Sequence, residues 1–186
     1  MQHWAMIAKD FPFLHAYNTF VAHVEWTYGI PIHVRDVPDP FTGDLDGTDI
    51  QVDYDLTPAD ALFIAAHLVG HTIQWNISAQ ERAIGLLPVP TPCIDEQLLC
   101  DLEAYERQAA RYSLQALHDA GIRQLDQWFS DYAECDVRYL LDFYRSGVKR
   151  EPLEFWVDGT AVVAPLAIPS FTLTRWIDSR NRGIVI

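Results

Sequence analysis

Residues 61–71 read Ala61-Leu-Phe-Ile-Ala-Ala-His67-Leu-Val-Gly-His71, and this stretch decides the fold. The run Ala61–Val69 is apolar on nearly every face except at His67, which is typical of a helix buried in the middle of a domain. The two histidines are four residues apart, so their imidazoles project from the same side of the helix about one turn apart. We therefore expect a central helix that carries a pair of adjacent imidazoles.

The histidine pair is a candidate for metal binding. Two neutral imidazoles on one helix can occupy two corners of a tetrahedral Zn²⁺ site if a third ligand comes from another element. The spacing alone is weak evidence, because the chain has seven histidines and such a pair arises easily by chance. Buried ring nitrogens nevertheless need partners, and a metal ion satisfies them economically. The interpretation therefore depends on finding a third ligand.

Glu106 is the candidate third ligand, on a second helix predicted from Asp95 to His118. The apolar stripe of this helix consists of Leu98, Leu99, Leu102, Tyr105, Ala109, Tyr112, Ala116 and Leu117. Glu106 lies inside this stripe, and burying a carboxylate is costly unless it is paired or bound to a cation. The two histidines could share such a cation with it. The alternative is a buried ion pair between Glu106 and Arg107 or Arg111.

The remaining pattern predicts an α+β fold. In chain order we expect a helix over Pro12–Tyr28, strands over Ile30–Val34 and Asp49–Tyr54, helices over Thr57–Trp75, Asp95–His118 and Gln124–Ser146, and a β-hairpin over Glu154–Val163. The hairpin is indicated by Asp158-Gly159, which can supply the two positive-φ positions of a tight turn. The run Asp36–Asp49 holds five aspartates but departs from the Ca²⁺-loop pattern, so we expect a solvated loop there.

Composition and charge narrow the function classes. The chain has 186 residues, of which 49% are hydrophobic and 21% charged, as in an ordinary globular protein. Its formal net charge of −13 disfavours direct binding to nucleic acid and to anionic membrane surfaces. No apolar run approaches the length needed to cross a bilayer. Cys93, Cys100 and Cys135 lack the spacing of a metal or redox motif, so we expect buried free thiols and a cytoplasmic location.

The order of the elements, with the motifs His67-Leu-Val-Gly-His71 and Glu106-Arg-Gln-Ala-Ala-Arg-Tyr-Ser, resembles the ImmA/IrrE metallopeptidases. In that family a His-Glu-Leu-Gly-His helix precedes a helix with a Glu-x-Glu-Ala-x-x-Phe-Ala pattern. The resemblance covers about Pro12–Leu117 and implies a minimal gluzincin fold in which Zn²⁺ is held by the two histidines and Glu106. Gln108 stands where the family has its second acidic residue, and Tyr112 stands for the aromatic one.

The resemblance also suggests a division of the chain. Residues 1–120 would form a zincin-like metal-binding domain. Residues 121–186 would form an extension, a helix plus a β-hairpin, packed on that domain. The implied substrates of the family, transcriptional repressors, are not carried over to this chain, because of the departure from the family pattern described next.

The main departure from the family is Leu68, which follows the first histidine. In zincins this position is the glutamate that deprotonates the zinc-bound water and then passes the proton on, and leucine can do neither. Such proton transfer contributes roughly 10²–10⁴-fold to the rate. A rescuing carboxylate would have to come from Glu103, Asp101 or Glu96, although helix geometry points Glu103 away from the apolar stripe.

Three hypotheses about function follow. The first is a zincin-like metal-binding protein with lost or altered peptidase activity, for which we expect a protein or peptide partner. The second is an active metallo-hydrolase with a relocated base, for which Glu103 is the candidate. The third is a metal-free structural or interaction protein in which His67, His71 and Glu106 form a buried hydrogen-bonded cluster. Zn²⁺ is the expected metal, and Fe²⁺ or another divalent ion fits the same ligand types.

Overall fold

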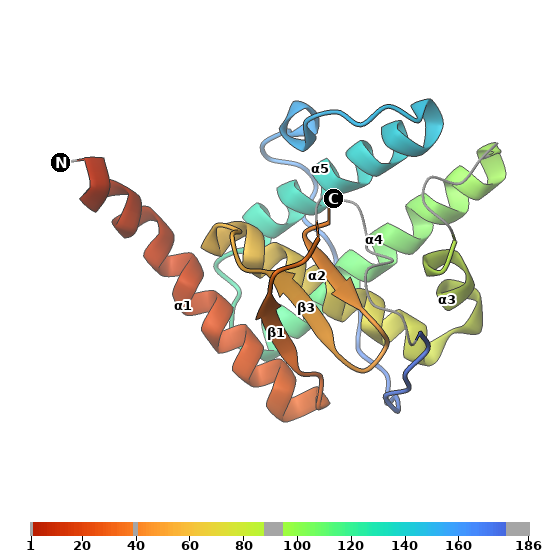
Figure 1. The fold of residues 1–186 in the computed structure, drawn as a ribbon, viewed down its shortest axis with the longest axis horizontal. Coiled ribbons are helices and arrows are strands. Elements are labelled where there is room, and N and C mark those ends of the chain that lie inside the picture. Colours follow the sequence, from red (N-terminus) through yellow and green to blue (C-terminus); the bar gives the residue numbers. More distant parts are fainter. Residues whose placement is uncertain (1, 39–40, 88–94, 178–186) are drawn as a thin grey trace.

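Five α-helices and a three-stranded sheet make up the described part of the chain, residues 2–38, 41–87 and 95–177, in a computed structural model (Figure 1). The elements are α1 (Gln2–Tyr28), β1 (Ile32–Arg35), β2 (Gly43–Leu45), β3 (Ile50–Asp53), α2 (Pro58–Ile77), α3 (Ala79–Gly85), α4 (Glu96–Asp119), α5 (Asp126–Ser146) and the 3₁₀ helix η1 (Pro152–Phe155). The predicted α+β class is confirmed.

Helix α2 is the central element, as its sequence predicts. The side chain of Thr57 accepts a hydrogen bond from the backbone N–H of Asp60, and Pro58 begins the helix. Every residue from Leu62 to Trp75 is buried. The sheet lies over one side of α2, while α1 and α4 pack against other sides (Figure 1). A helix enclosed in this way offers the two histidines no route to bulk water along its own length.

The sheet has the strand order β1-β3-β2. Strand β1 runs parallel to β3, with Ile32 opposite Ile50, and β2 runs antiparallel to β3, with Gly43 opposite Val52. Gly43 lies directly over α2, because a Cβ atom there would come within 2.7 Å of Leu68 Cδ1. The absence of a side chain at this glycine therefore allows β2 to pack closely on the helix.

The prediction of a solvated loop over Asp36–Asp49 is wrong for its middle part. Residues 43–45 form the buried strand β2, and Asp44 and Asp46 are also buried. Asp46 tolerates burial because its Oδ1 accepts hydrogen bonds from the backbone N–H groups of Thr48 and Asp49 and from the Thr48 hydroxyl. Burial opposes ionisation of Asp46, but these hydrogen bonds outweigh it and lower the pKa of its carboxyl group.

The predicted β-hairpin over Glu154–Val163 is also wrong. Residues 152–155 form η1, and the segment after it contains no strand. The Asp158-Gly159 turn does exist, with Gly159 at φ 72°. N–H groups of the turn and of the residues after it donate instead to α5: those of Gly159 and Thr160 to the Asp131 carboxylate, and that of Val163 to the Ser130 hydroxyl.

Residues 157–177, which we call the C-terminal strap, run in irregular conformation across several helices. The strap contacts α4 through a hydrogen bond from Leu166 N–H to the Arg111 carbonyl. It then reaches α2, where Thr174 N–H donates to Asn76 Oδ1, and the end of β2, where Trp176 N–H donates to the Asp46 carbonyl. The strap therefore ties the C-terminal part of the chain to the sheet and to α2.

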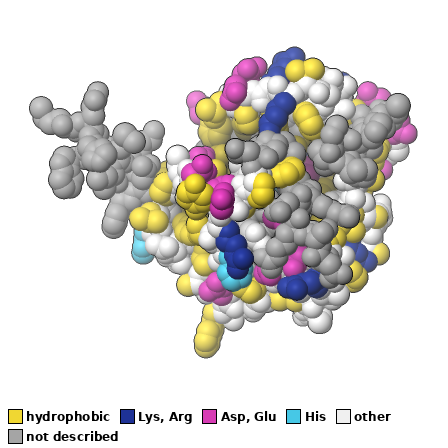
Figure 2. Space-filling model, in the orientation of Figure 1, with side chains coloured by type: hydrophobic (Ala, Val, Ile, Leu, Met, Phe, Trp, Pro, Cys, Tyr) yellow, Lys and Arg dark blue, Asp and Glu magenta, His cyan; other side chains and the backbone are white. Residues whose placement is uncertain are grey.

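In the described residues, surface charge, membrane spans and thiol burial agree with the predictions from composition only in part. Acidic and basic side chains lie interspersed on the face seen in Figure 2. Among the described helices, none is long and apolar enough to cross a membrane. The prediction of buried thiols holds for Cys135 but is wrong for Cys100, which is exposed, and Cys93 lies outside the described residues.

Candidate metal centre

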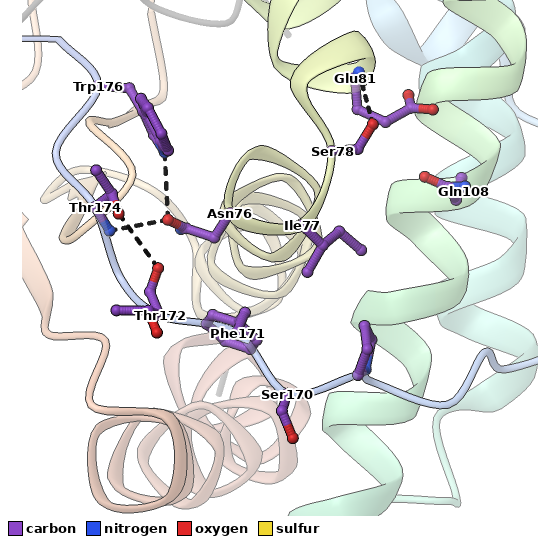
Figure 3. Close-up of a pocket in the computed structure, with 11 residues that line it drawn as sticks. Asn76, Ile77, Ser78, Glu81, Gln108, Ser170, Phe171, Thr172, Thr174 and Trp176 are labelled. Atoms are coloured by element: carbon purple, nitrogen blue, oxygen red, sulfur yellow. Dashed lines mark hydrogen bonds between the residues drawn. The ribbon is translucent and has the colours of Figure 1, made fainter.

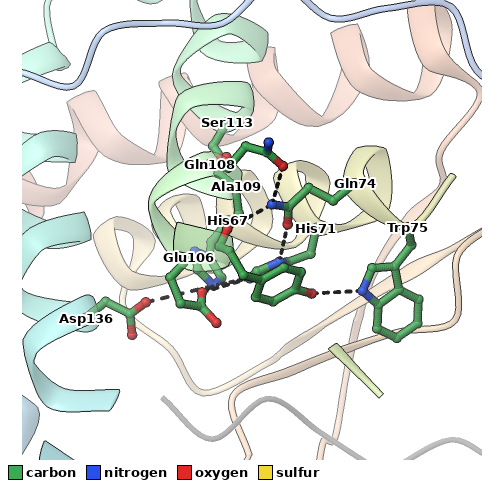
Figure 4. Close-up of polar contacts among 10 residues, drawn as sticks. His67, His71, Gln74, Trp75, Glu106, Gln108, Ala109, Ser113 and Asp136 are labelled. Atoms are coloured by element: carbon green, nitrogen blue, oxygen red, sulfur yellow. Dashed lines mark hydrogen bonds and ion pairs between the residues drawn. The ribbon is translucent and has the colours of Figure 1, made fainter. Parts of the chain in front are cut away.

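His67 and His71 on α2 and Glu106 on α4 converge on one point in the interior (Figure 4). The Nε2 atoms of the two histidines are 2.8 Å apart, and Glu106 Oε2 lies 3.0 Å from His71 Nε2 and 3.4 Å from His67 Nε2. The exposed fractions are 2% for His67, 0% for His71 and 8% for Glu106. These three side chains form a buried cluster that could hold a metal ion, and we call it the His–His–Glu cluster.

The dimensions of the cluster suit a small divalent cation. Zinc bonds of about 2.0–2.1 Å in a tetrahedral site place neighbouring ligand atoms about 3.3 Å apart. The separations of 2.8 and 3.0 Å are shorter than that value, and the separation of 3.4 Å is close to it. A small outward shift of the side chains would therefore accommodate the ion. Two imidazole nitrogens and one carboxylate oxygen are also a common zinc donor set. The residues present therefore fit the metal that the sequence resemblance implies.

Gly70 allows the two helices to come close enough for this convergence. A Cβ atom on Gly70 would lie 2.3 Å from the carbonyl oxygen of Ala109 and 2.4 Å from the Ser113 hydroxyl, both on α4. Real side chains do not approach so closely, so α2 and α4 cross at this glycine. Gly70 lies between His67 and His71 in the sequence, which places the helix contact beside the cluster.

The hydrogen bonds of Gln74 determine which nitrogen of His71 is free to bind a metal. The Gln74 Nε2 group donates to the Tyr105 carbonyl and to Gln108 Oε1, so its other atom, Oε1, is the acceptor (Figure 4). Gln74 Oε1 lies 2.9 Å from His71 Nδ1, which must therefore carry the proton and donate it. In neutral His71 the lone pair is then on Nε2, directed at Glu106 and His67. A hydrogen-bonded Nδ1 of this kind is usual for metal-binding histidines.

Aromatic rings hold both imidazoles in place. The Tyr105 ring stacks on His71 with ring centroids 4.5 Å apart, and the Phe63 ring stacks on His67 at 5.6 Å. Tyr105 is itself fixed, because its hydroxyl accepts a hydrogen bond of 2.8 Å from the Trp75 indole N–H. The rings therefore keep their orientation independently of any ion.

Burial and mutual proximity control ionisation in the cluster. Burial, followed by the proximity of His71, lowers the pKa of His67 to about 3, against a smaller opposing effect of Glu106, so its imidazole is neutral at pH 7. For Glu106, burial favours the neutral acid, but the attraction and hydrogen bond of His71 and the attraction of His67 bring its pKa below the usual value. This attraction and hydrogen bond require positive charge beside Glu106, which is either a proton on His71 Nε2 or a metal cation between the three side chains.

Asp136 on α5 adds a fourth side chain that the sequence analysis missed. Its Oδ2 lies 3.9 Å from His67 Nε2, and it is 2% exposed. Figure 4 shows its carboxylate directed toward His67 and Glu106. A signal existed, because Asp136 lies among the buried residues Phe129, Ala133, Val137 and Leu140 of α5. That is the same pattern of a carboxylate within an apolar stripe that identified Glu106.

The carboxylates proposed as replacement bases lie elsewhere. Glu103 pairs with Arg107 at 2.8 Å on the outer side of α4, and its side chain is 39% exposed. Asp101 accepts a hydrogen bond from Gln97, and Glu96 is an exposed residue 3.7 Å from Arg145. Each of the three thus has a contact of its own outside the His–His–Glu cluster.

The alternative of an arginine partner for Glu106 is not what the structure shows. Arg107 pairs with Glu103 and Glu134, each at 2.8 Å, and Arg111 donates to the carbonyl of Ala164 on the strap. Glu106 contacts the two histidines instead. The guanidinium groups are therefore engaged on the outside of α4, and the charge of Glu106 is left to the imidazoles.

Leu68 points toward the sheet. Its side chain is fully buried and contacts β2 at Gly43, as described above. Successive helix residues are rotated by about 100° relative to one another, so Leu68 and His67 face different neighbours. The position that carries the general base in zincins is thus occupied by a core residue in this chain.

A pocket of about 800 Å³ has Gln108 in its lining (Figure 3). It is lined by Asn76, Ile77, Ser78, Glu81 and Gln108 together with strap residues between Pro169 and Trp176. Gln108 connects this pocket to His71 through Gln74, by two successive hydrogen bonds. The pocket therefore borders the support of the cluster, and the three candidate ligands are not among its lining residues.

No protein-family model, curated protein or solved structure matches this chain. The resemblance to the ImmA/IrrE metallopeptidases therefore depends on the quoted motifs alone.

Proposed function

We propose that this chain is a zincin-like metal-binding protein, related to the ImmA/IrrE metallopeptidases, that holds one Zn²⁺ through His67, His71 and Glu106 and has lost peptidase activity. The observation that carries the proposal is the convergence of three ligand atoms within 3.4 Å of one another in a site that is at most 8% exposed. When bound there, the ion would neutralise Glu106 and link α2 to α4, and so contribute to folding.

The same geometry argues against peptide hydrolysis. A catalytic zinc site keeps an open position for water and substrate, and it needs a group that can take a proton from that water. His67 and His71 are almost completely enclosed, Leu68 faces the sheet, and Glu103 lies on the outside of α4. The His–His–Glu cluster therefore has the features of a metal site that stabilises the fold or a partner-binding surface.

Metal analysis of the full-length protein tests the proposal. Protein purified without added metal should contain about one Zn²⁺ per chain, and His67→Ala and Glu106→Gln should lose most of it. Glu103→Gln is the matched control, because Glu103 lies on the same helix but pairs with Arg107 outside the cluster. Its zinc content should equal that of the unmodified chain, and no variant should hydrolyse peptides.

Chelation gives a second measurement. Removing the ion should lower the unfolding midpoint of the unmodified protein, because the free energy of unfolding falls by about 2.7 kcal/mol relative to a free zinc concentration 100 times the dissociation constant. If the purified protein contains no zinc and a strong chelator leaves its unfolding midpoint unchanged, the three side chains form a metal-free hydrogen-bonded cluster instead. Iron in place of zinc in the purified protein would retain the site but change the metal.

A further inference from the structure

The buried Asp136 carboxylate is the least satisfied polar group beside the His–His–Glu cluster. Its side chain is 1% exposed, and its Oδ1 has no hydrogen-bond partner among the described residues. The other oxygen, Oδ2, is 3.9 Å from His67 Nε2, a distance too long for a hydrogen bond. A buried carboxylate without donors is costly unless something at the site compensates it.

We propose that Asp136 is the fourth protein ligand of the metal, which makes the site a closed one built from α2, α4 and α5. This inference rests on the proposed function, because it assumes that the cluster binds Zn²⁺. Tetrahedral zinc sites with four protein ligands are structural, whereas catalytic sites leave one position open. Coordination by Asp136 thus explains why a zincin-like ligand set is retained without a general base.

The distances define the movement that this assignment requires. Neighbouring ligand atoms of a tetrahedral zinc ion lie about 3.3 Å apart. Asp136 Oδ2 is 3.9 Å from His67 Nε2, but Asp136 is not in the group whose ligand atoms all lie within 4.8 Å of one another, so its side chain must turn inward by more than an ångström to reach all three ligands. The carboxylate comes from α5, and Figure 4 shows it approaching His67 from a different direction than His71 does.

Charge balance supports it independently. Two neutral imidazoles and one carboxylate around Zn²⁺ leave a net charge of +1 in a site that excludes water. A second carboxylate brings the net charge of the site to zero. Without the ion, the two carboxyl groups cannot both carry a charge in the same enclosed space except at high cost, and a divalent cation removes that restriction. The pair of acids therefore fits a divalent cation better than it fits an empty site.

The test compares Asp136→Asn with the unmodified chain and with Asp131→Asn. Asp131 is a second buried acid on α5, but four donors from its own helix and the strap satisfy it, so it is a matched control. Zinc affinity is measured by titration against a competing chelator. We expect Asp136→Asn to weaken Zn²⁺ binding by about 100-fold or more, the upper end of the loss seen when support for a metal ligand is removed. Asp131→Asn should leave the affinity unchanged.

Thermal unfolding and cobalt spectra separate ligation from a purely structural role. Asp136→Asn should raise the midpoint of the metal-free protein, because it removes an unpaired buried acid, and lower the midpoint of the zinc-loaded protein. Co²⁺ bound to the unmodified chain should give the intense visible bands of a four-coordinate site, and these should change in Asp136→Asn. Asp136→Leu should behave in the same way, without an amide oxygen that could substitute as a ligand.

The outcomes distinguish this inference from the proposed function. If the unmodified chain binds zinc and His67→Ala abolishes binding, while Asp136→Asn leaves affinity, midpoints and cobalt spectrum unchanged, the fourth-ligand assignment is wrong and the three-ligand site stands. If the unmodified chain binds neither Zn²⁺ nor Co²⁺, both proposals are wrong.

Discussion

Two buried aspartates on helix α5, Asp131 and Asp136, have opposite surroundings although they are only five residues apart. Asp131 Oδ1 accepts hydrogen bonds from Gln127 and from both the N–H and the hydroxyl of Thr160, and its Oδ2 accepts one from Gly159 N–H. Asp136 has no partner for its Oδ1 in the described part of the chain, and only the distant His67 faces its Oδ2.

The pKa values of the Asp131 and Asp136 carboxyl groups differ because their hydrogen-bond donors differ. Burial acts on both carboxyl groups, but at Asp131 the hydrogen bonds of Thr160, Gly159 and Gln127 outweigh it and lower the pKa. At Asp136 burial, reinforced by the negative charge of Glu106, raises the pKa well above the usual value. The comparison teaches that fractional exposure alone does not reveal the role of a buried acid. The hydrogen-bond donors around the acid separate Asp131, which anchors the strap, from Asp136, for which we propose a metal ion as partner.

Leu68→Glu should have the largest effect, because it would place a further buried carboxylate under Gly43 of β2, where no donor or cation among the described residues compensates it. We expect a loss of roughly 3–5 kcal/mol in the free energy of unfolding, the range for an uncompensated buried charge. Urea denaturation measures it, and peptide hydrolysis should not appear. Leu68→Met preserves the volume and should cost less than about 1.5 kcal/mol. A stable Leu68→Glu protein that cleaves peptides would show that this position does reach the metal site.

The long elements and the His–His–Glu cluster could be predicted because their signals are local. The apolar face of α2 and the apolar stripe of α4 recur every three to four residues, so the position of Glu106 within its stripe could be read from neighbouring residues. Thr57 as N-cap of α2 and Gly147 in left-handed conformation at the end of α5 were predictable for the same reason.

The predictions that were wrong or incomplete concern segments whose structure depends on contacts with residues far away in the sequence. Asp158-Gly159 does form a turn, yet the N–H groups after it are taken by Asp131 and Ser130 of α5, and no local pattern specifies that competition. Asp46, directly after β2, was predicted to be solvated because its hydrogen-bond and ion-pair partners, in part local and in part Arg175 on the strap, are not visible as a periodic pattern. Asp136 had a local signal, but its approach to His67 depends on how α5 packs.

Asp131→Asn tests the other side of the comparison. The amide cannot accept all the hydrogen bonds from Thr160, Gly159 and Gln127, so we expect a loss of about 2 kcal/mol, with or without zinc. The effect should shrink as the pH falls below about 3.9, the ordinary value for aspartate, because the lowered pKa of Asp131 stabilises the fold above that value and this contribution is lost on protonation.

Chemical denaturation across that pH range measures the effect of Asp131→Asn. Thr160→Val removes only the hydroxyl donor and leaves the backbone N–H, so it serves as a graded control with an expected loss of about 1 kcal/mol. A change in zinc affinity as large as that of Asp136→Asn would contradict the separation of the two acids.

Gly70→Ala should lower stability moderately and should have the most selective effect on the cluster. The new methyl group would meet the Ala109 carbonyl and the Ser113 hydroxyl, so α2 and α4 must move apart. Overpacking costs about 1–3 kcal/mol, and the better helix propensity of alanine returns up to about 1 kcal/mol of it. Chelator competition should show weaker Zn²⁺ binding, because the histidines and Glu106 then lie farther apart.

Ala104→Gly on the exposed face of α4 is the control, with a comparable loss of stability and unchanged affinity. The hydrogen bonds from the strap to Asp131 should be unaffected by Gly70→Ala. Equal zinc affinity in Gly70→Ala and the unmodified chain would mean that the helix crossing does not set the ligand spacing.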